Sequence, residues 1–183
     1  MSNFQHPQKG AGTISIGSTD EKGLTVNAQY NPKELQVDRT VPWTKTNQAN
    51  QSNKNGINLE FTGADGRSMS VELLFDEYET GNSSKVAKSV DDLNTMASVW
   101  KPDSQKEEER RPHLCVVTWG ATIPTFKCVI ESVSTKYTMF SPAGDPLRAT
   151  CTVKLKEADS VTGKSSSGGS GGAGGAGGGG APK

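Results

Sequence analysis

The chain has 183 residues, and its 20 Lys and Arg residues balance 20 Asp and Glu residues, so the formal net charge is zero. A dedicated nucleic-acid-binding protein would show a basic excess or a basic stripe, so this balance argues against that class. The N-terminus lacks an apolar signal segment, and no apolar run approaches membrane-spanning length. We therefore expect synthesis in the cytoplasm, without a signal peptide and without direct membrane insertion.

The composition divides the chain into three parts. Residues 1–12 are polar and rich in glycine, which predicts a flexible N-terminal arm. Residues 13–158 hold nearly all of the apolar side chains and form one folded domain. Residues 159–183 are dominated by Gly, Ser and Ala and are predicted to be a linker or tail, because they cannot bury enough apolar surface to offset their ordering entropy.

Two short strands are predicted near the start of the domain. Thr13–Gly17 is a strand candidate, and apolar and polar residues alternate over Leu24–Tyr30 with the period of a half-buried strand. Asn31 and Pro32 then take the first two positions of a type I turn. We therefore predict a hairpin in which Leu24–Tyr30 pairs with a second strand over Leu35–Val41.

The next segment, Thr44–Gly56, is almost free of apolar residues. A loop of this length within a compact domain is usually functional or disordered. Apolar alternation resumes at Ile57–Phe61 and again at Met69–Phe75, with the sequence TGADGR between the two stretches. This pattern predicts a second hairpin that turns at TGADGR.

A single helix is predicted at about residues 84–100. Ser83 or Ser84 is expected to cap its N-terminus, and Pro102 ends it. The charged segment Asp103–Pro112 that follows is interpreted as a solvated connection. The apolar residues of the helix recur at steps of three and four, as one buried face requires: Val86, Val90, Leu93, Ala97 and Trp100.

The last three predicted strands are the most regular. His113–Trp119 is mostly apolar, and Phe126–Phe140 changes the parity of its apolar positions near Ser132, which predicts a β-bulge. The final strand alternates without error from Leu147 to Lys156. The predicted fold class is therefore mainly β: an antiparallel barrel or sandwich of seven or eight strands with one inserted α-helix.

The residues that could carry chemistry do not form a constellation. His113 and Cys115 lie two apart on one strand without a third orienting group, so we predict no catalytic pair. Cys115, Cys128 and Cys151 lack metal-ligand spacing and are expected to be reduced core thiols. Trp43, Trp100 and Trp119 fall on different elements. No catalytic, metal or cofactor site is predicted, and the surfaces of the protein are expected to matter more than any pocket.

Two stretches of sequence carry a family resemblance. They are FTGADGRSMSVELLFDEYETG and the C-terminal run FKCVIESVSTKYTMFSPAGDPLRATCTVKLKE, and the YNPKE segment followed by Trp43 agrees with them. Together they resemble the tube and adaptor proteins of contractile injection systems, the LysM-associated baseplate proteins of phage-tail-like particles, over about Thr13 to Glu157. Members often continue into a LysM-type module, whereas here the Gly-rich tail follows.

This resemblance implies a tail-tube (Hcp-like) barrel with a flanking helix, six copies of which form a ring. It implies a hexameric adaptor or tube initiator, which joins a trimeric spike protein of the VgrG type to the inner tube protein and contacts other baseplate or sheath components. The particle would be released from the cell or anchored at a membrane. Three alternatives remain open: the bulk inner-tube protein, a free carbohydrate-binding β-sandwich with an aromatic platform, and a thiol enzyme that depends on Cys115.

Two sets of residues are predicted to serve assembly. The polar segment is expected to reach the next ring and to become ordered on stacking; its candidate residues are Trp43, Thr44, Lys45, Thr46, Asn47, Gln48, Asn50, Gln51 and Asn53. The polar side of the last strand is expected to line the water-filled lumen, with an outer solvated face as the alternative; its candidate residues are Arg148, Thr150, Thr152, Lys154 and Lys156.

Overall fold

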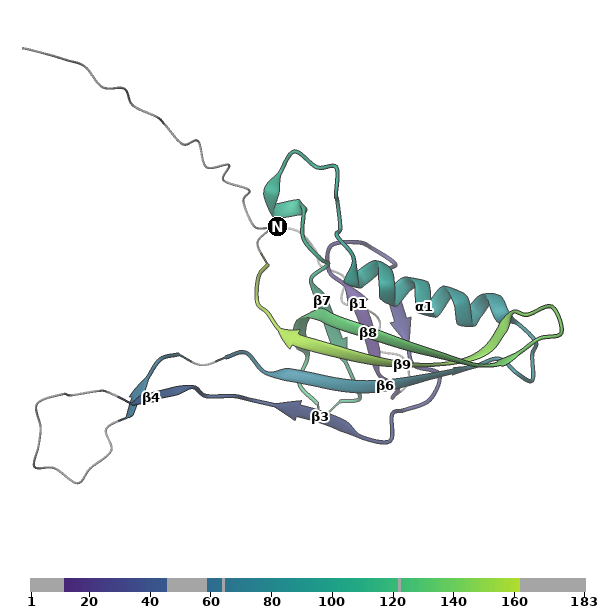
Figure 1. The fold of residues 1–183 in the computed structure, drawn as a ribbon, viewed down its shortest axis with the longest axis horizontal. Coiled ribbons are helices and arrows are strands. Elements are labelled where there is room, and N and C mark those ends of the chain that lie inside the picture. Colours follow the sequence, from purple (N-terminus) through teal and green to yellow (C-terminus); the bar gives the residue numbers. More distant parts are fainter. Residues whose placement is uncertain (1–11, 46–58, 64, 122, 162–183) are drawn as a thin grey trace, which may run out of the picture.

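The computed structural model describes residues 12–45, 59–63, 65–121 and 123–161, and within them the protein is mainly β with one α-helix (Figure 1). This confirms the predicted fold class at the level of a mainly antiparallel β-protein with one inserted helix. The elements are β1 (Ser15–Ser18), β2 (Thr25–Asn27), β3 (Leu35–Asp38), β4 (Trp43–Lys45), β5 (Leu59–Phe61), β6 (Ser68–Asp76), α1 (Ser83–Ala97), a short 3-10 helix (Glu107–Glu109), β7 (Cys115–Thr118), β8 (Phe126–Phe140) and β9 (Pro146–Glu157).

Seven strands form one antiparallel sheet in the order β2-β1-β7-β8-β9-β6-β3, and β4 and β5 form a separate two-stranded ribbon. In the described part of the chain no strand pairing joins the edges β2 and β3. The sheet is therefore open, and the closed form of the predicted barrel is not formed by the single chain.

The predicted hairpin around Asn31 and Pro32 is wrong. β2 pairs with β1, whereas β3 pairs with β6, so the two strands lie at opposite edges of the sheet. Residues 28–34 connect one edge to the other. The alternation was a true sign of burial, because Val26 and Ala28 are buried, but alternation does not identify which strand is the partner.

The second predicted hairpin is also wrong, because the chain does not reverse at TGADGR. β5 pairs with β4 and β6 pairs with β3. β3 and β4 therefore form one side of a long, interrupted hairpin, and β5 and β6 form the other side (Figure 1). Gly66 serves a close crossing instead. A Cβ at Gly66 would lie 2.9 Å from the carbonyl oxygen of Glu157, so the backbone passes the end of β9 where a side chain has no room.

The bulge predicted in β8 is confirmed. The register with β9 shifts between Ile130 and Ser132. Before the shift Cys128 pairs with both β7 and β9, and after it β8 continues along β9 alone to Phe140. The bulge therefore marks the point at which β8 leaves one half of the fold and extends the other.

The core lies between α1, the first half of the sheet and the inner sides of β6 and β9. α1 packs against β8 and β9 through a buried face of Val86, Val90, Leu93 and Met96. The helix ends at Ala97, three residues before Trp100, so Met96 completes the apolar stripe in place of Trp100. Asn82, rather than Ser83 or Ser84, occupies the N-cap position, and its side chain makes no capping hydrogen bond.

Candidate assembly surfaces

One face of the sheet formed by β3, β6, β9 and β8 is predominantly polar, with Leu74 on β6 and Val129 on β8 as its partly buried apolar members. On β9 the residues from Leu147 to Leu155 alternate between buried apolar side chains and partly or fully exposed polar ones. Cross-strand partners in an antiparallel sheet share a face, so the polar side of β9 extends onto its neighbours. These neighbours are Ser68, Ser70, Glu72 and Asp76 on β6, Ser132, Ser134, Lys136 and Thr138 on β8, and Gln36 and Asp38 on β3.

All five predicted lumen residues belong to this polar face. Arg148 pairs in register with Asp76 and Thr138, and its guanidinium makes a close ion pair with the Asp76 carboxylate. This hydrogen bond lowers the pKa of Asp76 below its ordinary value, so the pair stays charged at neutral pH. Thr150 and Thr152 are half-buried within the same face, whereas Lys154 and Lys156 are exposed.

Both sides of this four-stranded region end in free strand edges within the described residues. Beyond the bulge, Ser132 to Phe140 of β8 pair with β9 on one side only, and β3 pairs with β6 on one side only. Unpaired edges of this kind present backbone N–H and C=O groups that another chain can bind. The polar face is therefore bordered on both sides by unpaired strand edges within the described residues.

The β4–β5 ribbon projects away from the sheet and carries exposed apolar side chains (Figure 1). Trp43 pairs in register with Phe61, and their ring centroids lie 5.5 Å apart; both side chains are more than half exposed. Leu59 pairs with Lys45 on the same face of the ribbon. Leu59 and Phe61 lie on one face of a strand, as the alternation predicts, and this apolar face is exposed because the strand has no core behind it.

The base of the ribbon is fixed to the end of β9. Arg67 donates hydrogen bonds from Nε and from a terminal nitrogen to Oε1 of Glu157, at 3.0 and 2.6 Å, and from its backbone N–H to Oε2 at 2.8 Å. The Glu157 backbone N–H donates in return to the carbonyl oxygen of Arg67 at 2.7 Å. These contacts lower the pKa of Glu157 to about 2, so the carboxylate is charged over the physiological range.

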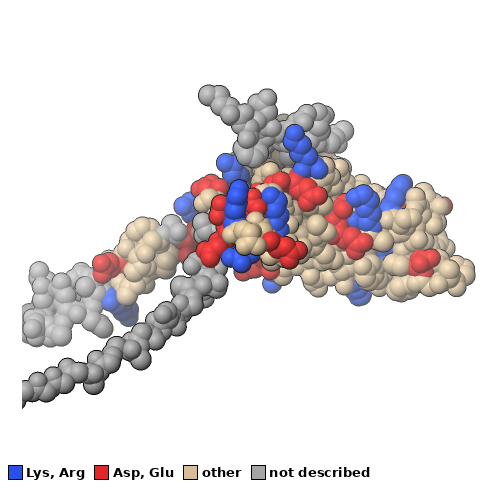
Figure 2. Space-filling model, turned by 90° about the horizontal axis from the view of Figure 1, so that it is seen from above, with Lys and Arg blue, Asp and Glu red and all other residues tan. Residues whose placement is uncertain are grey.

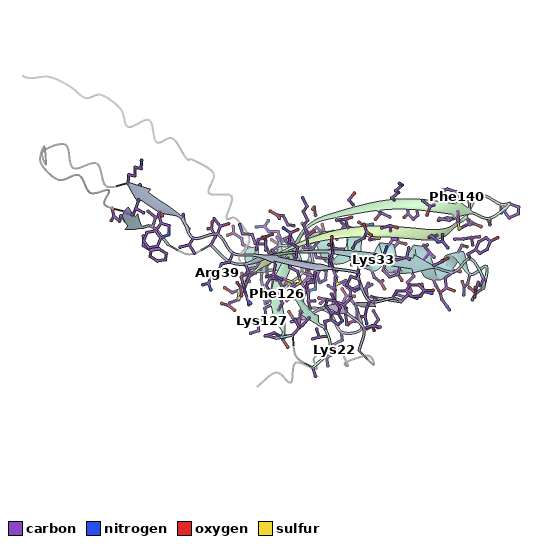
Figure 3. All side chains as sticks on the ribbon, turned by 90° about the horizontal axis from the view of Figure 1, so that it is seen from below. Lys22, Lys33, Arg39, Phe126, Lys127 and Phe140 are labelled. Atoms are coloured by element: carbon purple, nitrogen blue, oxygen red, sulfur yellow. The ribbon has the colours of Figure 1, made fainter. Side chains whose placement is uncertain are left out.

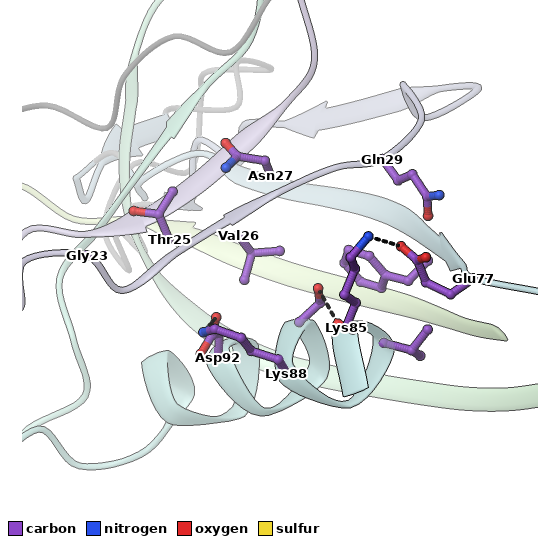
Figure 4. Close-up of a pocket in the computed structure, with 12 residues that line it drawn as sticks. Gly23, Thr25, Val26, Asn27, Gln29, Glu77, Lys85, Lys88 and Asp92 are labelled. Carbon is purple, nitrogen blue, oxygen red and sulfur yellow. Dashed lines mark hydrogen bonds and ion pairs between the residues drawn. The ribbon is translucent and has the colours of Figure 1, made fainter. Parts of the chain in front are cut away.

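A cavity of about 370 Å³ lies between the outer edge of β2 and α1 (Figure 4). Two ion pairs line it. Lys85 Nζ lies 3.5 Å from Oε1 of Glu77, and Lys88 Nζ lies 2.7 Å from Oδ2 of Asp92. Each lysine is thus neutralised by a neighbouring carboxylate, and the cavity offers no unbalanced charge with which to bind an ion.

His113 and Cys115 do not form a reactive pair. His113 is buried, and its Nδ1 is 2.8 Å from Oγ of Ser18, whose oxygen accepts two backbone N–H bonds and therefore donates its hydrogen to the ring. Burial raises the pKa of Cys115 to about 12, so the thiol is protonated at neutral pH rather than a nucleophilic thiolate. Cys115, Cys128 and Cys151 are all buried and unbridged, and the described residues contain no cluster of three metal-ligating side chains.

The three tryptophans do not share a surface. Trp43 lies on the ribbon, Trp119 packs against the core, and Trp100 lies near His113 with Lys101 over its ring. No helix in the described ranges is long and apolar enough to cross a bilayer. Trp43, Trp100 and Trp119 thus do not form one common aromatic platform, and the exposed aromatic rings beside Trp43 are those of the ribbon.

The predicted partner segment is only partly described. Trp43, Thr44 and Lys45 form β4, so the polar segment begins as a strand rather than as a loop. Thr46, Asn47, Gln48, Asn50, Gln51 and Asn53 lie outside the described residues, as do most of the predicted N-terminal arm and tail. Sequence reasoning missed Leu59 and Phe61 as surface residues, although their position directly after the polar segment was a usable signal.

Comparison with known protein families gives one match. The family model described as contractile injection system tube protein matches residues 14–166. This range begins just before β1 and extends beyond β9, so it includes the polar face, its free edges and the ribbon. No curated protein matches the chain significantly.

Proposed function

This chain belongs to the contractile injection system tube protein family, and we propose that it forms a hexameric ring that joins the spike to the inner tube. Family membership establishes a structural subunit of the tube type. The ring, its position and its immediate partners are the proposal. The partners proposed are a trimeric spike protein of the VgrG type, the inner tube protein, and other baseplate or sheath components.

The observation that carries this proposal is the polar four-stranded face with a free strand edge on each side. If β8 of one copy lies beside β3 and β6 of the next, the sheets of neighbouring copies continue one another. Repetition around a ring would place the polar side chains of β9 along a water-filled lumen. The same contact would cover the two edges, which otherwise invite uncontrolled pairing in the free subunit.

The ribbon supports a second contact, made along the axis of the particle. Its exposed Trp43 and Phe61 would gain burial against a neighbouring ring, and the polar segment between β4 and β5 would become ordered there. Deletion of Asn47–Asn55 is expected to leave a folded subunit that cannot extend a tube. Tubes of normal length from that variant would contradict this part of the proposal.

The bulk inner-tube protein is the alternative, and the description of the matched family favours it as directly as it favours an adaptor. Copy number separates the two roles, because an adaptor contributes one ring of six copies to each particle whereas a tube protein contributes many rings. Assembly of either in the cytoplasm, followed by release or membrane anchoring of the particle, is part of the proposal.

The experiment that tests the proposal is co-purification of the chain with the spike protein, followed by negative-stain imaging. Six-fold rings bound to the spike, with six copies per particle, are the expected result. Long stacks of rings without the spike would identify the bulk tube protein. A chain that stays monomeric both alone and with the spike would refute both roles.

A further inference from the structure

His113 is buried where the turn after β1 meets the segment that precedes β7. Its side chain is 2 % exposed, and its Nδ1 lies 2.8 Å from Oγ of Ser18, the last residue of β1. The same oxygen accepts the backbone N–H groups of Asp20 and Glu21, both at 3.1 Å. One hydroxyl therefore connects the imidazole to the turn.

The hydrogen bond between Ser18 and His113 has one possible direction. A serine oxygen carries two lone pairs, and both are used here by backbone N–H groups. The hydroxyl hydrogen is therefore donated to Nδ1, which is the nitrogen without a proton in a neutral imidazole. A proton on Nδ1 would face the hydroxyl hydrogen, or would compete with the N–H groups of the turn for the same oxygen. The contact is thus complete only while His113 is neutral.

A carboxylate makes a second connection between the same two segments. Asp20 accepts hydrogen bonds from both terminal nitrogens of Arg111, at 2.7 and 3.0 Å, and from the Leu114 N–H at 2.7 Å. Burial by itself would raise the pKa of Asp20, but the hydrogen bonds from Arg111 and Leu114 outweigh it and hold the pKa below its ordinary value. The pair therefore stays charged over the pH range in which a histidine titrates. We call Ser18, Asp20, Arg111 and His113 the clasp.

The clasp holds a charged segment, residues 99–112, that follows α1. A bridge between Val99 and Pro112 closes the base of this segment, and the Trp100 N–H donates to the carbonyl oxygen of Arg111 at 2.8 Å. Among the ion pairs of the described residues, the pair of Arg111 with Asp20 is the one that joins the segment to the rest of the chain. Figure 2 shows charged side chains gathered over this part of the molecule, seen from above. The other ion pairs of the segment are internal: Lys101 with Glu109, Lys106 with Glu109, and Arg110 with Glu107.

The charges on the turn side of His113 act on its protonation in opposite directions. Burial has the largest effect and lowers the pKa of His113, and the Arg111 cation lowers it further, whereas Asp20 and Glu21 raise it without cancelling the decrease. A histidine of the unfolded chain titrates near pH 6.5. The stability that neutral His113 contributes is therefore fully present above about pH 6.5 and is lost as the pH falls towards the lower pKa of the folded chain.

The other elements around His113 bring one thiol and one cation. On β7 the Cys115 thiol donates to the His113 carbonyl oxygen at 3.6 Å, and its pKa of about 12 leaves it uncharged. Beyond the end of α1 the Lys101 ammonium lies 4.1 Å from the centroid of the Trp100 ring, and this ring lies 6.4 Å from the imidazole. Neither group offers an acceptor to a protonated ring.

We propose that the clasp is an acid-operated switch: protonation of His113 separates its ring from Ser18 and releases residues 99–112 from the turn after β1, while the sheet stays folded. Local opening of this kind costs a domain less free energy than global unfolding. The clasp lies at β1 and β7, so the opening leaves the polar face on β3, β6, β9 and β8 unchanged. Figure 3 shows Lys22 of the released turn at the periphery of the molecule, away from Phe140 at the end of the β8–β9 hairpin. The inference concerns a single subunit and does not depend on ring formation.

Hydrogen exchange of the full chain, measured by mass spectrometry, tests the switch. Protection factors, which are corrected for the intrinsic effect of pH on exchange, should fall about tenfold or more for residues 99–112 between about pH 7.5 and about pH 5, while β9 keeps its protection within about twofold. His113→Asn keeps an oxygen acceptor near the position of Nδ1 but cannot be protonated, so its protection should change by no more than about twofold. His6→Asn removes the other histidine of the sequence and, as the matched control, should respond as the wild-type chain does.

Equal protection of residues 99–112 at both pH values would overturn the inference, and so would a response that persists in His113→Asn. An equal loss of protection in β9 would show global unfolding and would overturn it as well. If His113→Asn does not fold, NMR of His6→Asn decides, because that variant contains a single imidazole. Its titration midpoint should lie below about pH 6.5 and coincide with the midpoint of the protection loss. Midpoints more than about half a pH unit apart would refute the switch.

Discussion

The side-chain amide of Gln29 binds the backbone of Asp76 as a strand partner would. Its Nε2 donates to the Asp76 carbonyl oxygen and its Oε1 accepts from the Asp76 N–H, both at 2.7 Å. Asp76 ends β6 at the open side of the sheet, and residues 28–34 cross there from β2 to β3. One side chain therefore joins the crossover to the side of β6 that β3 leaves unpaired after Val71.

Replacement of Gln29 by alanine is expected to lower the free energy of unfolding by about 1–2 kcal/mol, because two hydrogen bonds at a partly solvated site are lost. Urea denaturation of the free chain measures the change. Gln36→Ala removes the same side chain from a position where it binds only the carboxylate of Asp38, and serves as the control. Equal midpoints for the two variants would contradict the role of Gln29.

The ribbon is predicted to matter for assembly more than for folding. Trp43→Ala removes a ring whose partner, Phe61, is itself exposed, so the free energy of unfolding of the free chain should change by no more than about 1 kcal/mol. Stacking should fall about tenfold or more, which corresponds to roughly 1.4 kcal/mol per contact. Thr44→Ala on the opposite face of the ribbon is the control, and sedimentation and imaging are the measurements. Normal stacking by Trp43→Ala would refute the prediction.

The polar face is tested by the accessibility of one residue. Thr150→Cys should react with a bulky maleimide in the free chain and be protected in closed rings and stacks, whereas Asn94→Cys on α1 should react in both. Mass spectrometry after timed labelling measures the ratio of the two rates. Equal labelling of Thr150→Cys before and after assembly would exclude this face from the lumen and favour an outer solvated face.

The ion pair between Arg67 and Glu157 predicts a pH dependence. Glutamate in an unfolded chain titrates near pH 4.3, whereas hydrogen bonds from Arg67 lower the pKa of Glu157 in the folded chain to about 2. The stabilisation is therefore fully present above about pH 4.3 and is lost as the pH falls towards 2. Glu157→Gln should flatten the decline of the urea midpoint over that range, and Glu131→Gln, an exposed position on β8, should not. Parallel profiles for the wild-type chain and Glu157→Gln would contradict the prediction.

Gly66 is expected to tolerate no side chain. A Cβ there would meet the carbonyl oxygen of Glu157 at 2.9 Å and its Cβ at 3.3 Å, so the ribbon base or the end of β9 must move. Gly66→Ala should lower the free energy of unfolding by about 1–3 kcal/mol, as other forced overpacking does. Asp65→Ala, at the neighbouring exposed position, is the control for urea denaturation. An unchanged midpoint for Gly66→Ala would show that the crossing is loose.

Sequence patterns predicted the structural features that depend only on the burial of individual side chains. The bulge in β8, the alternation of β9 and the buried face of α1 all followed from periodicity, because each side chain reports directly on its own environment. Strand partners did not follow, since the alternation around Val26 is the same whichever strand pairs with it. Ion pairs such as Arg111 with Asp20 join residues 91 positions apart, and charge alone does not select one partner among many.

The assembly surfaces could be predicted only in part, because periodicity indicates the burial of each side chain but not its strand partner. The polar parity of β9 indicated a solvated face but not which neighbours extend it, because that depends on the register of β6 and β8. The alternation over Leu59 and Phe61 predicted a strand with an apolar face, but not whether anything covers that face. Their exposure follows from the position of the ribbon beyond the sheet, where nothing in the single chain covers them.

The pairing of Ser15 with Thr118 limits when β1 can complete its folding during synthesis. β1 leaves the ribosome about a hundred residues before β7, the strand that places it inside the sheet, so it has only β2 as a partner during most of synthesis. Non-local closure of this kind slows folding, and here it postpones burial of Ile14 and Ile16 until β7 is made. Nascent chains that end before Cys115 should therefore be cleaved readily by protease, whereas chains that include β9 resist it. The free edges of β3 and β8 are then presented only by chains whose translation is nearly complete. In the proposed assembly, unfinished chains would therefore not be incorporated.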